Sequence, residues 1–187
     1  ALPRAMMSQT STFDRESRRV SALDWRPRGV VLRPDPGIWW MSGGLGAFCA
    51  VPLAHDTVRL FVTGRDTAIR SRIGVVTLQW RERPRVDAIS PEPVLDLGDL
   101  GTFDMDGVSY PWIVENGPEL WMYYVGWNRL GGEIPFRVQV GLAISTNGGR
   151  SFERVTRAPL LPLTHGEPIG SGSVWVERLA GGWRMFY

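Results

Sequence analysis

The sequence contains no lysine, so arginine supplies all 21 basic residues, which nearly balance the 19 Asp and Glu residues at a net charge of +2. This near balance lacks the basic excess typical of nucleic-acid binding, and we expect no nucleic-acid partner. The single cysteine, Cys49, excludes an internal disulfide and a cysteine-based zinc site. We expect no metal or cofactor, and one thiol favours a reducing, cytoplasmic location.

Long apolar runs and helical periodicity are also scarce. No uncharged apolar stretch approaches the roughly 18 residues of a membrane span, so we expect no membrane insertion. The 22 Gly, 14 Pro and 9 Trp residues surround short runs of Val, Trp, Tyr and Phe, a composition typical of many short antiparallel strands. The prediction is an all-β fold, with residues 1–24 as a flexible arm and residues 25–187 as one β-domain.

A repeat runs through this β-domain. Arg59–Gly64 resembles Trp121–Gly126, and the pattern returns as Trp183–Tyr187, at spacings of 62 and 63 positions. A second strand recurs as well, with Ser71–Val76 matching Gln139–Ile144. Strands repeated at constant spacing predict the blades of a β-propeller, and the alternative is a β-sandwich with similar strands.

The length of the chain limits how many blades it supplies. At this spacing, 187 residues give about three blades, whereas closed propellers have about four to eight. The prediction is therefore a propeller that is incomplete at the C-terminus of this chain.

Several segments resemble one family of carbohydrate-active proteins. They are Gly101–Val108 with Pro111, Leu120–Asn128, Pro135–Arg137, Gly141–Ser145 and His165–Pro168. They resemble the five-bladed propellers of the glycoside hydrolase family 43, 32, 68 and 130 type. They are most similar to glycosidase-like proteins encoded among bacterial polysaccharide biosynthesis genes. Five such blades would need about 310 residues.

The resemblance implies a pair of carboxyl groups, which glycoside hydrolysis requires. Glu167 would be the general acid, and Asp106 would tune that acid and hold a sugar hydroxyl. The two lie 18 and 16 positions before Met185 and Met122, so the repeat predicts equivalent places in successive blades. The alternative is that Asp106 belongs to a turn and Glu167 to a surface loop.

The first blade departs from this family pattern. No Asp or Glu lies between Asp35 and Asp56, so the base or nucleophile of the hydrolases is absent there. Cys49 is no replacement at its ordinary pKa. Either another carboxylate, such as Asp104, does this work or the chain is not a standard hydrolase.

Five further side chains are candidates for substrate binding. Arg137 and Arg72 precede equivalent strands, where an arginine either clamps an acidic sugar or forms a structural ion pair. His165 is a candidate partner for a hydroxyl or for Glu167. Trp112 and Trp127 adjoin the candidate site segments and could stack on sugar faces.

Residues 145–152 fit the Asp-box pattern of sialidases, with Asn147 for Asp and Phe152 for Trp. This pattern predicts a hairpin turn with an anchoring aromatic side chain and carries no catalytic role.

Two functions follow from these observations. The first is a glycoside hydrolase-like enzyme, a glycosidase or glycan phosphorylase, that acts on a glycan with Glu167 as general acid. The second is a non-catalytic sugar-binding or accessory module of a polysaccharide pathway. Both imply a carbohydrate ligand, and neither predicts an oligomeric state.

Overall fold

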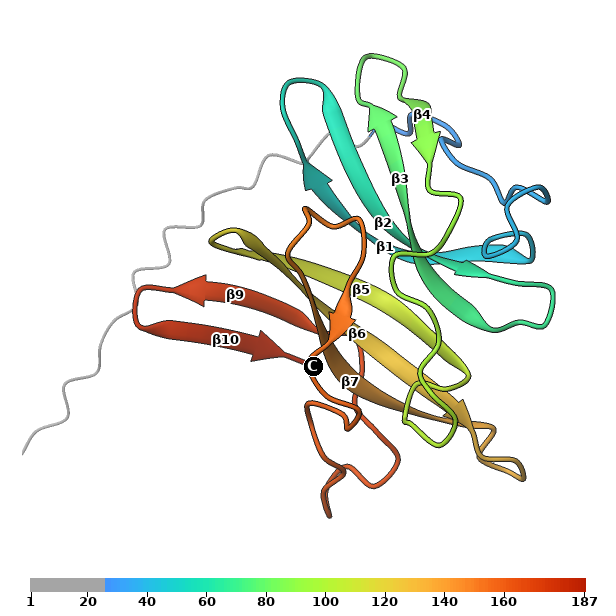
Figure 1. The fold of residues 1–187 in the computed structure, drawn as a ribbon, viewed down its shortest axis with the longest axis vertical. Coiled ribbons are helices and arrows are strands. Elements are labelled where there is room, and N and C mark those ends of the chain that lie inside the picture. The colour runs from blue at the N-terminus through green and yellow to red at the C-terminus, as the bar shows by residue number, and fades with distance from the viewer. Residues whose placement is uncertain (1–25) are drawn as a thin grey trace, which may run out of the picture.

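A computed structural model describes residues 26–187, and every regular element within them is a β-strand (Figure 1). The predicted arm, residues 1–24, lies outside the described residues. The strands are β1 (Gly44–Pro52), β2 (Thr57–Arg65), β3 (Ser71–Gln79), β4 (Arg85–Ile89), β5 (Gly107–Asn116), β6 (Glu119–Arg129), β7 (Phe136–Ser145), β8 (Glu153–Arg154), β9 (Trp175–Leu179) and β10 (Gly182–Phe186). The all-β prediction is confirmed for this part of the chain.

The strands form two antiparallel four-stranded units and a hairpin. β1 to β4 make the first unit, β5 to β8 the second unit, and β9 with β10 the C-terminal hairpin. Between the two units, β3 and β5 pair in parallel at one position, Ser71 with Gly107. The propeller interpretation predicts inner strands at Val108–Val114 and Gly170–Val176, and β5 contains the first of them. The predicted strand Gly170–Val176 is wrong at its start, because positive φ angles at Gly170 and Ser173 interrupt the extended backbone and β9 begins at Trp175.

Strand pairing corrects the predicted repeat by one residue. Gly64 pairs with Arg72 in the first unit, and Gly126 pairs with Gln139 in the second, so Arg72 corresponds to Gln139. The sequence match had placed Ser71 against Gln139. The structural reason lies two positions further on, at Gly74 and Gly141. A Cβ atom on these two glycines would lie 2.3 Å from the Trp40 ring and 2.4 Å from the Tyr124 ring.

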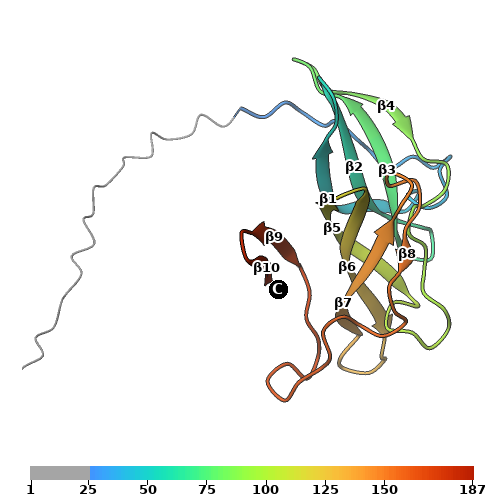
Figure 2. The ribbon, with the colours of Figure 1, turned by 60° about the vertical axis from the view of Figure 1, so that its left-hand side comes forward.

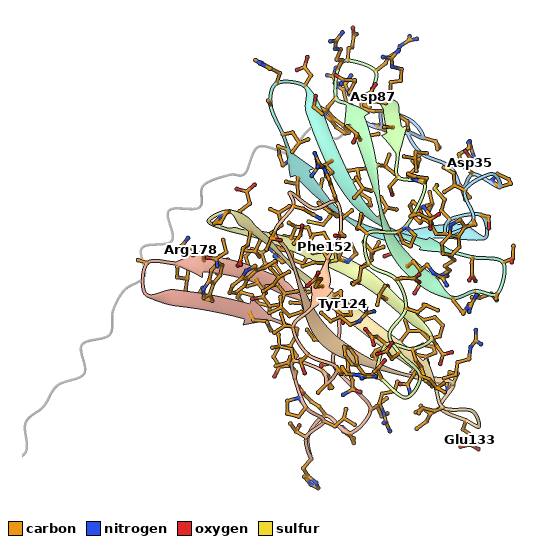
Figure 3. All side chains as sticks on the ribbon, in the orientation of Figure 1. Asp35, Asp87, Tyr124, Glu133, Phe152 and Arg178 are labelled. Carbon is orange, nitrogen blue, oxygen red and sulfur yellow. The ribbon has the colours of Figure 1, made fainter. Side chains whose placement is uncertain are left out.

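Two apolar cores lie between these layers. The larger core joins the first and second units and includes Phe61 and Leu95 with Tyr124 and Phe152. Figure 3 shows Tyr124 and Phe152 in the middle of the molecule. A second core joins β6 and β7 to the C-terminal hairpin through residues such as Tyr123 and Val176, and Figure 2 shows this hairpin as a separate layer. Side-chain packing thus joins the hairpin to the second unit, and it joins the first and second units together with the single strand pair between β3 and β5.

The turn between β7 and β8 has the predicted structure. Asn147 Oδ1 accepts hydrogen bonds from the backbone N–H groups of Arg150 and Ser151 at 3.0 and 3.1 Å. Phe152 inserts into the core and meets Phe61 edge-on at a ring separation of 5.7 Å. Arg59 of β2 also donates to the carbonyl of Gly148, which ties the turn to the first unit.

Candidate functional site

The candidate site is the segment before β5 and its counterparts before β1 and β9. Asp106 N donates to Trp127 O at 3.3 Å, just as Gly43 N donates to Arg65 O at 2.8 Å. Since Gly107 pairs with Trp127 and Gly44 with Arg65, Gly43 is the counterpart of Asp106 in the first unit.

The first unit cannot carry a carboxylate at this position without backbone movement. A Cβ atom on Gly43 would lie 2.4 Å from the carbonyl oxygen of Asp66, far inside van der Waals contact. The fold therefore leaves no room for a side chain at the position where the sequence lacks an acidic residue.

Asp106 and Glu167 are not equivalent, which corrects the prediction from the repeat. Gly170 pairs in parallel with Val138, as Gly107 does with Ser71, so Gly170 corresponds to Gly107. Glu167 lies three residues before its glycine and Asp106 lies one before its own. Gly107 and Gly170 each lie 15 positions before Met122 and Met185, so the difference between 16 and 18 positions comes from the two extra residues between Glu167 and Gly170.

Both carboxylates are half-buried at the same end of the second unit. Asp106 Oδ2 accepts a hydrogen bond from Arg129 N at 2.8 Å. The Glu167 backbone N–H donates to the carbonyl and the hydroxyl of Thr164 at 3.2 and 3.1 Å, which fixes the local turn. Backbone contacts link the two segments. The Asp106 N–H donates to the Trp127 carbonyl, and Trp127 pairs with Val138 on the next strand. Val138 in turn forms a parallel bridge with Gly170, three residues after Glu167.

Asp104, the alternative carboxylate, is fully buried. Its two oxygens accept hydrogen bonds from the hydroxyls of Thr102 and Tyr124 at 2.8 and 2.9 Å. Arg154 Nε completes the set at 2.7 Å. Burial raises the pKa of Tyr124 above its ordinary value, and the negative charge of Asp104 raises this pKa further. The phenol therefore stays protonated and remains a hydrogen-bond donor. The structure does not bring Asp104 into contact with solvent, where a substrate would bind.

Arg72 lies in a buried ion-pair cluster. Its Nε is 2.6 Å from Asp96 Oδ1 and its Nη1 is 2.8 Å from Asp66 Oδ2. Its guanidinium also lies 4.6 Å from the centre of the Trp39 ring. Only 5% of the Arg72 side chain is exposed, so the geometry supports the structural alternative for this arginine.

Asp66 gives this cluster a testable pH dependence. Burial alone would raise the pKa of Asp66, but hydrogen bonds from Arg72 and Arg70 outweigh it and lower the pKa below its ordinary value. A lowered pKa stabilises the fold above the unfolded-state pKa of about 4 and less as the pH falls through the folded-state value. We expect the stability difference between the wild type and Asp66→Asn to shrink as the pH falls below about 4. Urea unfolding between neutral and acid pH measures it, and a constant difference would contradict the prediction.

The other predicted binding residues are held differently from one another. Trp112 Nε1 donates to Val176 O at 2.8 Å and its ring packs edge-on against Trp175, so it joins the second unit to the C-terminal hairpin. Trp127 Nε1 donates to Ser71 Oγ at 2.7 Å, next to the Asp106 backbone. His165 is exposed in the loop before Glu167.

Arg137 lines a cavity of about 550 Å³ at the end of β6 and β7, and neither Asp106 nor Glu167 lines it. Arg137 pairs across the strands with Asn128, and Gln139 follows on the same face. We expected Arg137 to border the pocket that holds the two candidate acids, but the cavity that it lines includes neither of them, so this expectation is not met.

Sequence reasoning missed Asn128, Gln139 and Arg154. Asn128 and Gln139 stand where the first unit has Asp66 and Arg72, and only the corrected register makes that comparison. Arg154 lies 50 positions after Asp104, and nothing in the local pattern links the two.

Residues 26–187 are the part of the chain that the structure describes. They contain no group of three or more His, Cys, Asp or Glu side chains placed to hold a metal ion. Within the same range, no helix is long and apolar enough to cross a membrane.

No protein-family model matches the chain. Two uncharacterised proteins of Mycobacterium tuberculosis, from strains CDC 1551 / Oshkosh and ATCC 25618 / H37Rv, are each 32% identical to it over 165 residues. The alignment covers 88% of this chain and 54% of each relative, so the chain spans about half the length of the curated relatives it matches.

Solved structures define the class of fold. A candidate glycosidase from Bacteroides thetaiotaomicron VPI-5482 superposes with a TM-score of 0.62 and 17% identity, over 84% of this chain and 50% of that one. A glycosyl hydrolase from Bacteroides ovatus gives a TM-score of 0.59 and 19% identity, over 84% of this chain and 48% of that one. The chain therefore has a glycosidase-like all-β fold.

Proposed function

We propose that this chain is part of a carbohydrate-active, five-bladed β-propeller of the glycoside hydrolase family 43, 32, 68 and 130 type. The two four-stranded units are the first two blades, and the C-terminal hairpin begins the third. β1, β5 and β9 are the innermost strands, and β5 contacts both β1 and β9. The non-glycine residues Tyr110 and Ser173 lie 63 positions apart and have similar positive φ angles of 50° and 60°, which supports a third unit of the same design.

The domain that begins at residue 25 would continue beyond this chain. The chain spans about half of its curated relatives. The C-terminal hairpin also leaves several aromatic side chains about half exposed, namely Trp175, Trp183, Phe186 and Tyr187. In a longer propeller a further strand and blade would cover these apolar surfaces. A cytoplasmic role beside other polysaccharide enzymes is part of the same proposal.

The function supported best is cleavage of a glycan, with Glu167 as general acid and Asp106 beside it. The observation that carries this proposal is the continuous backbone connection from Asp106 through Trp127 and Val138 to the Glu167 loop. This connection supports a common location for two half-buried carboxyl groups, at the end of successive blades where the inner strands would begin. Two carboxyl groups flanking the scissile bond are what glycoside hydrolysis needs.

One observation favours the second candidate, a non-catalytic sugar-binding module. The first blade has Gly43 where the second has Asp106, and the backbone of Asp66 occupies the space of any side chain there. Asp104 is fully buried and does not replace the missing base. A module of this kind would bind a glycan at the same end without cleaving it.

Replacement of Glu167 distinguishes the two functions. In the intact protein, screened against aryl glycosides and oligosaccharides with and without phosphate, we expect Glu167→Gln to lower kcat at least about 100-fold, because the amide cannot donate the proton. Glycan binding, measured by calorimetry, should change little. Glu133→Gln, at the tip of the β6–β7 hairpin (Figure 3), is the matched control and should keep full activity.

The outcomes separate cleanly. Binding of glycans without turnover would favour the sugar-binding module, and full activity of Glu167→Gln would remove Glu167 as the acid. Neither binding nor turnover with any carbohydrate would overturn the proposed function as a whole.

A further inference from the structure

The cavity beside Arg137 lies between three segments of the second unit. The ends of β6 and β7 form its floor, residues 100–103 form one wall, and residues 157–159 from the outer edge of the unit form the other. Its volume of about 550 Å³ lies within the range of small-molecule sites.

Two side chains that line this cavity, Asn128 and Arg137, each carry a buried polar atom with unmet hydrogen-bonding capacity. Asn128 Oδ1 and Arg137 Nε are both buried, and neither has a hydrogen-bond partner among the described residues. One is an acceptor and the other is a charged donor, and they stand on paired residues of β6 and β7. Buried polar groups are almost always satisfied, so two orphans side by side are unusual.

The first unit shows the same position in a satisfied form. There Asp66 takes the place of Asn128, and its Oδ2 accepts from Arg70 Nε at 3.0 Å and from Arg72 Nη1 at 2.8 Å. The Trp39 ring lies over Arg72. The second unit has Asn128 for the aspartate and Gln139 for Arg72, so Arg137 keeps its cationic head without a carboxylate partner.

A second arginine, Arg157, adds positive charge beside that of Arg137 at the cavity. Arg157 stands at the outer wall, where its Nη2 lies 2.7 Å from Asp99 Oδ2 in an exposed ion pair. An exposed pair of this kind contributes little and opens readily to a ligand. Two arginines and one aspartate thus leave the cavity positively charged.

We propose that this cavity is a binding site for a small hydroxylated anion, a sugar ring that carries a carboxylate or a phosphate group. The anion accepts hydrogen bonds from the Arg137 guanidinium, which suits such groups in charge and in planar geometry. A neighbouring ring hydroxyl hydrogen-bonds to the side-chain amide of Asn128. The side-chain amide of Gln139 lies on the same face and extends the polar floor. This site is separate from the Asp106 and Glu167 site and does not depend on its activity.

Binding by the intact protein tests the proposal. The probes are D-glucuronate and D-glucose 6-phosphate, with D-glucose and inorganic phosphate as the neutral and the non-sugar comparison, measured by calorimetry. We expect at least one of the two sugar anions to bind more tightly than both comparisons. Arg137→Met should weaken that binding at least about tenfold, because it removes the charged donor. Arg150→Met, on the exposed turn after β7, is the control and should bind normally.

Two stability readouts separate a binding residue from a structural one. The melting temperature of Arg137→Met should not fall, because the variant removes an unpaired buried donor. Asn128→Asp should raise the melting temperature and abolish anion binding, because it supplies Arg137 with the carboxylate that Arg70 has in the first unit. The proposal is overturned if Arg137→Met binds as the wild type does, if D-glucose or inorganic phosphate binds as tightly as both sugar anions, or if Arg137→Met unfolds at a clearly lower temperature.

Discussion

Asp104→Ala is expected to destabilise the protein by about 3–5 kcal/mol, because it leaves a buried charge without its partner. Asp104 is fully buried, and its Oδ2 is the acceptor for both Tyr124 at 2.9 Å and Arg154 at 2.7 Å. Its removal strands these two donors between the first and second units. Urea unfolding at neutral pH, followed by tryptophan fluorescence, measures the change in the free energy of unfolding.

Asp106→Ala is the matched control for this substitution. Asp106 lies two positions away, is half-buried, and its carboxylate accepts from the backbone of Arg129 alone among the interactions described. We expect it to lose no more than about 1.5 kcal/mol, the value of a typical hydrogen bond. If the two alanine variants unfolded at the same urea concentration, Asp104 would not be the structural carboxylate of the pair.

Trp40→Ala is expected to destabilise the protein by about 3–5 kcal/mol, the range for a large buried aromatic side chain. Trp40 is fully buried, and its ring covers Gly64 of β2 and Gly74 of β3 so closely that a Cβ atom on either would lie within 2.4 Å of it. Its Nε1 also donates to Ser90 O at 2.9 Å, which ties the segment before β1 to the outer edge of the first unit. No rearrangement of two glycines fills the space that the ring leaves.

Trp80→Ala serves as the comparison, because Trp80 is 51% exposed. Its loss should stay within about 0.5 kcal/mol, as for most surface substitutions. Thermal and urea unfolding measure the loss of unfolding free energy in both variants. A much larger loss for Trp40→Ala than for Trp80→Ala would show that the packing of Trp40 against the strands stabilises the fold. A Trp40→Ala protein as stable as Trp80→Ala would contradict this packing.

The strands were predictable because their signals are local. Short runs of Val, Trp, Tyr and Phe, with Gly and Pro between the runs, are sufficient to mark β2, β5 and β6, and they also led to the repeat. The turn at Asn147 was predictable for the same reason, since its hydrogen bonds join residues at most four positions apart. The register of the repeat was not predictable, because it depends on which glycines lie beneath Trp40 and Tyr124.

The candidate site was predictable only as a set of residues. Asp104 and Asp106 share one short segment, and the sequence offers no reason to bury one and leave the other accessible. Arg154, which lies 50 positions further on, decides that difference. The equivalence of Asp106 and Glu167 was wrong because Glu167 lies two residues further from Gly170 than Asp106 lies from Gly107, and the bridges at these two glycines set the true alignment.

By itself, the sequence determined the all-β class, the repeated unit and the lack of a carboxylate before β1, since each depends on residue type and spacing along the chain. The tertiary structure alone decided that Arg72 is neutralised and Arg137 is not. Both arginines are the second residue of the third strand of their unit, β3 or β7, and look alike in sequence. Asp66 and Asp96 reach Arg72, whereas Asn128 faces Arg137, so only the pairing of strands distant in sequence determines which guanidinium remains available to a ligand.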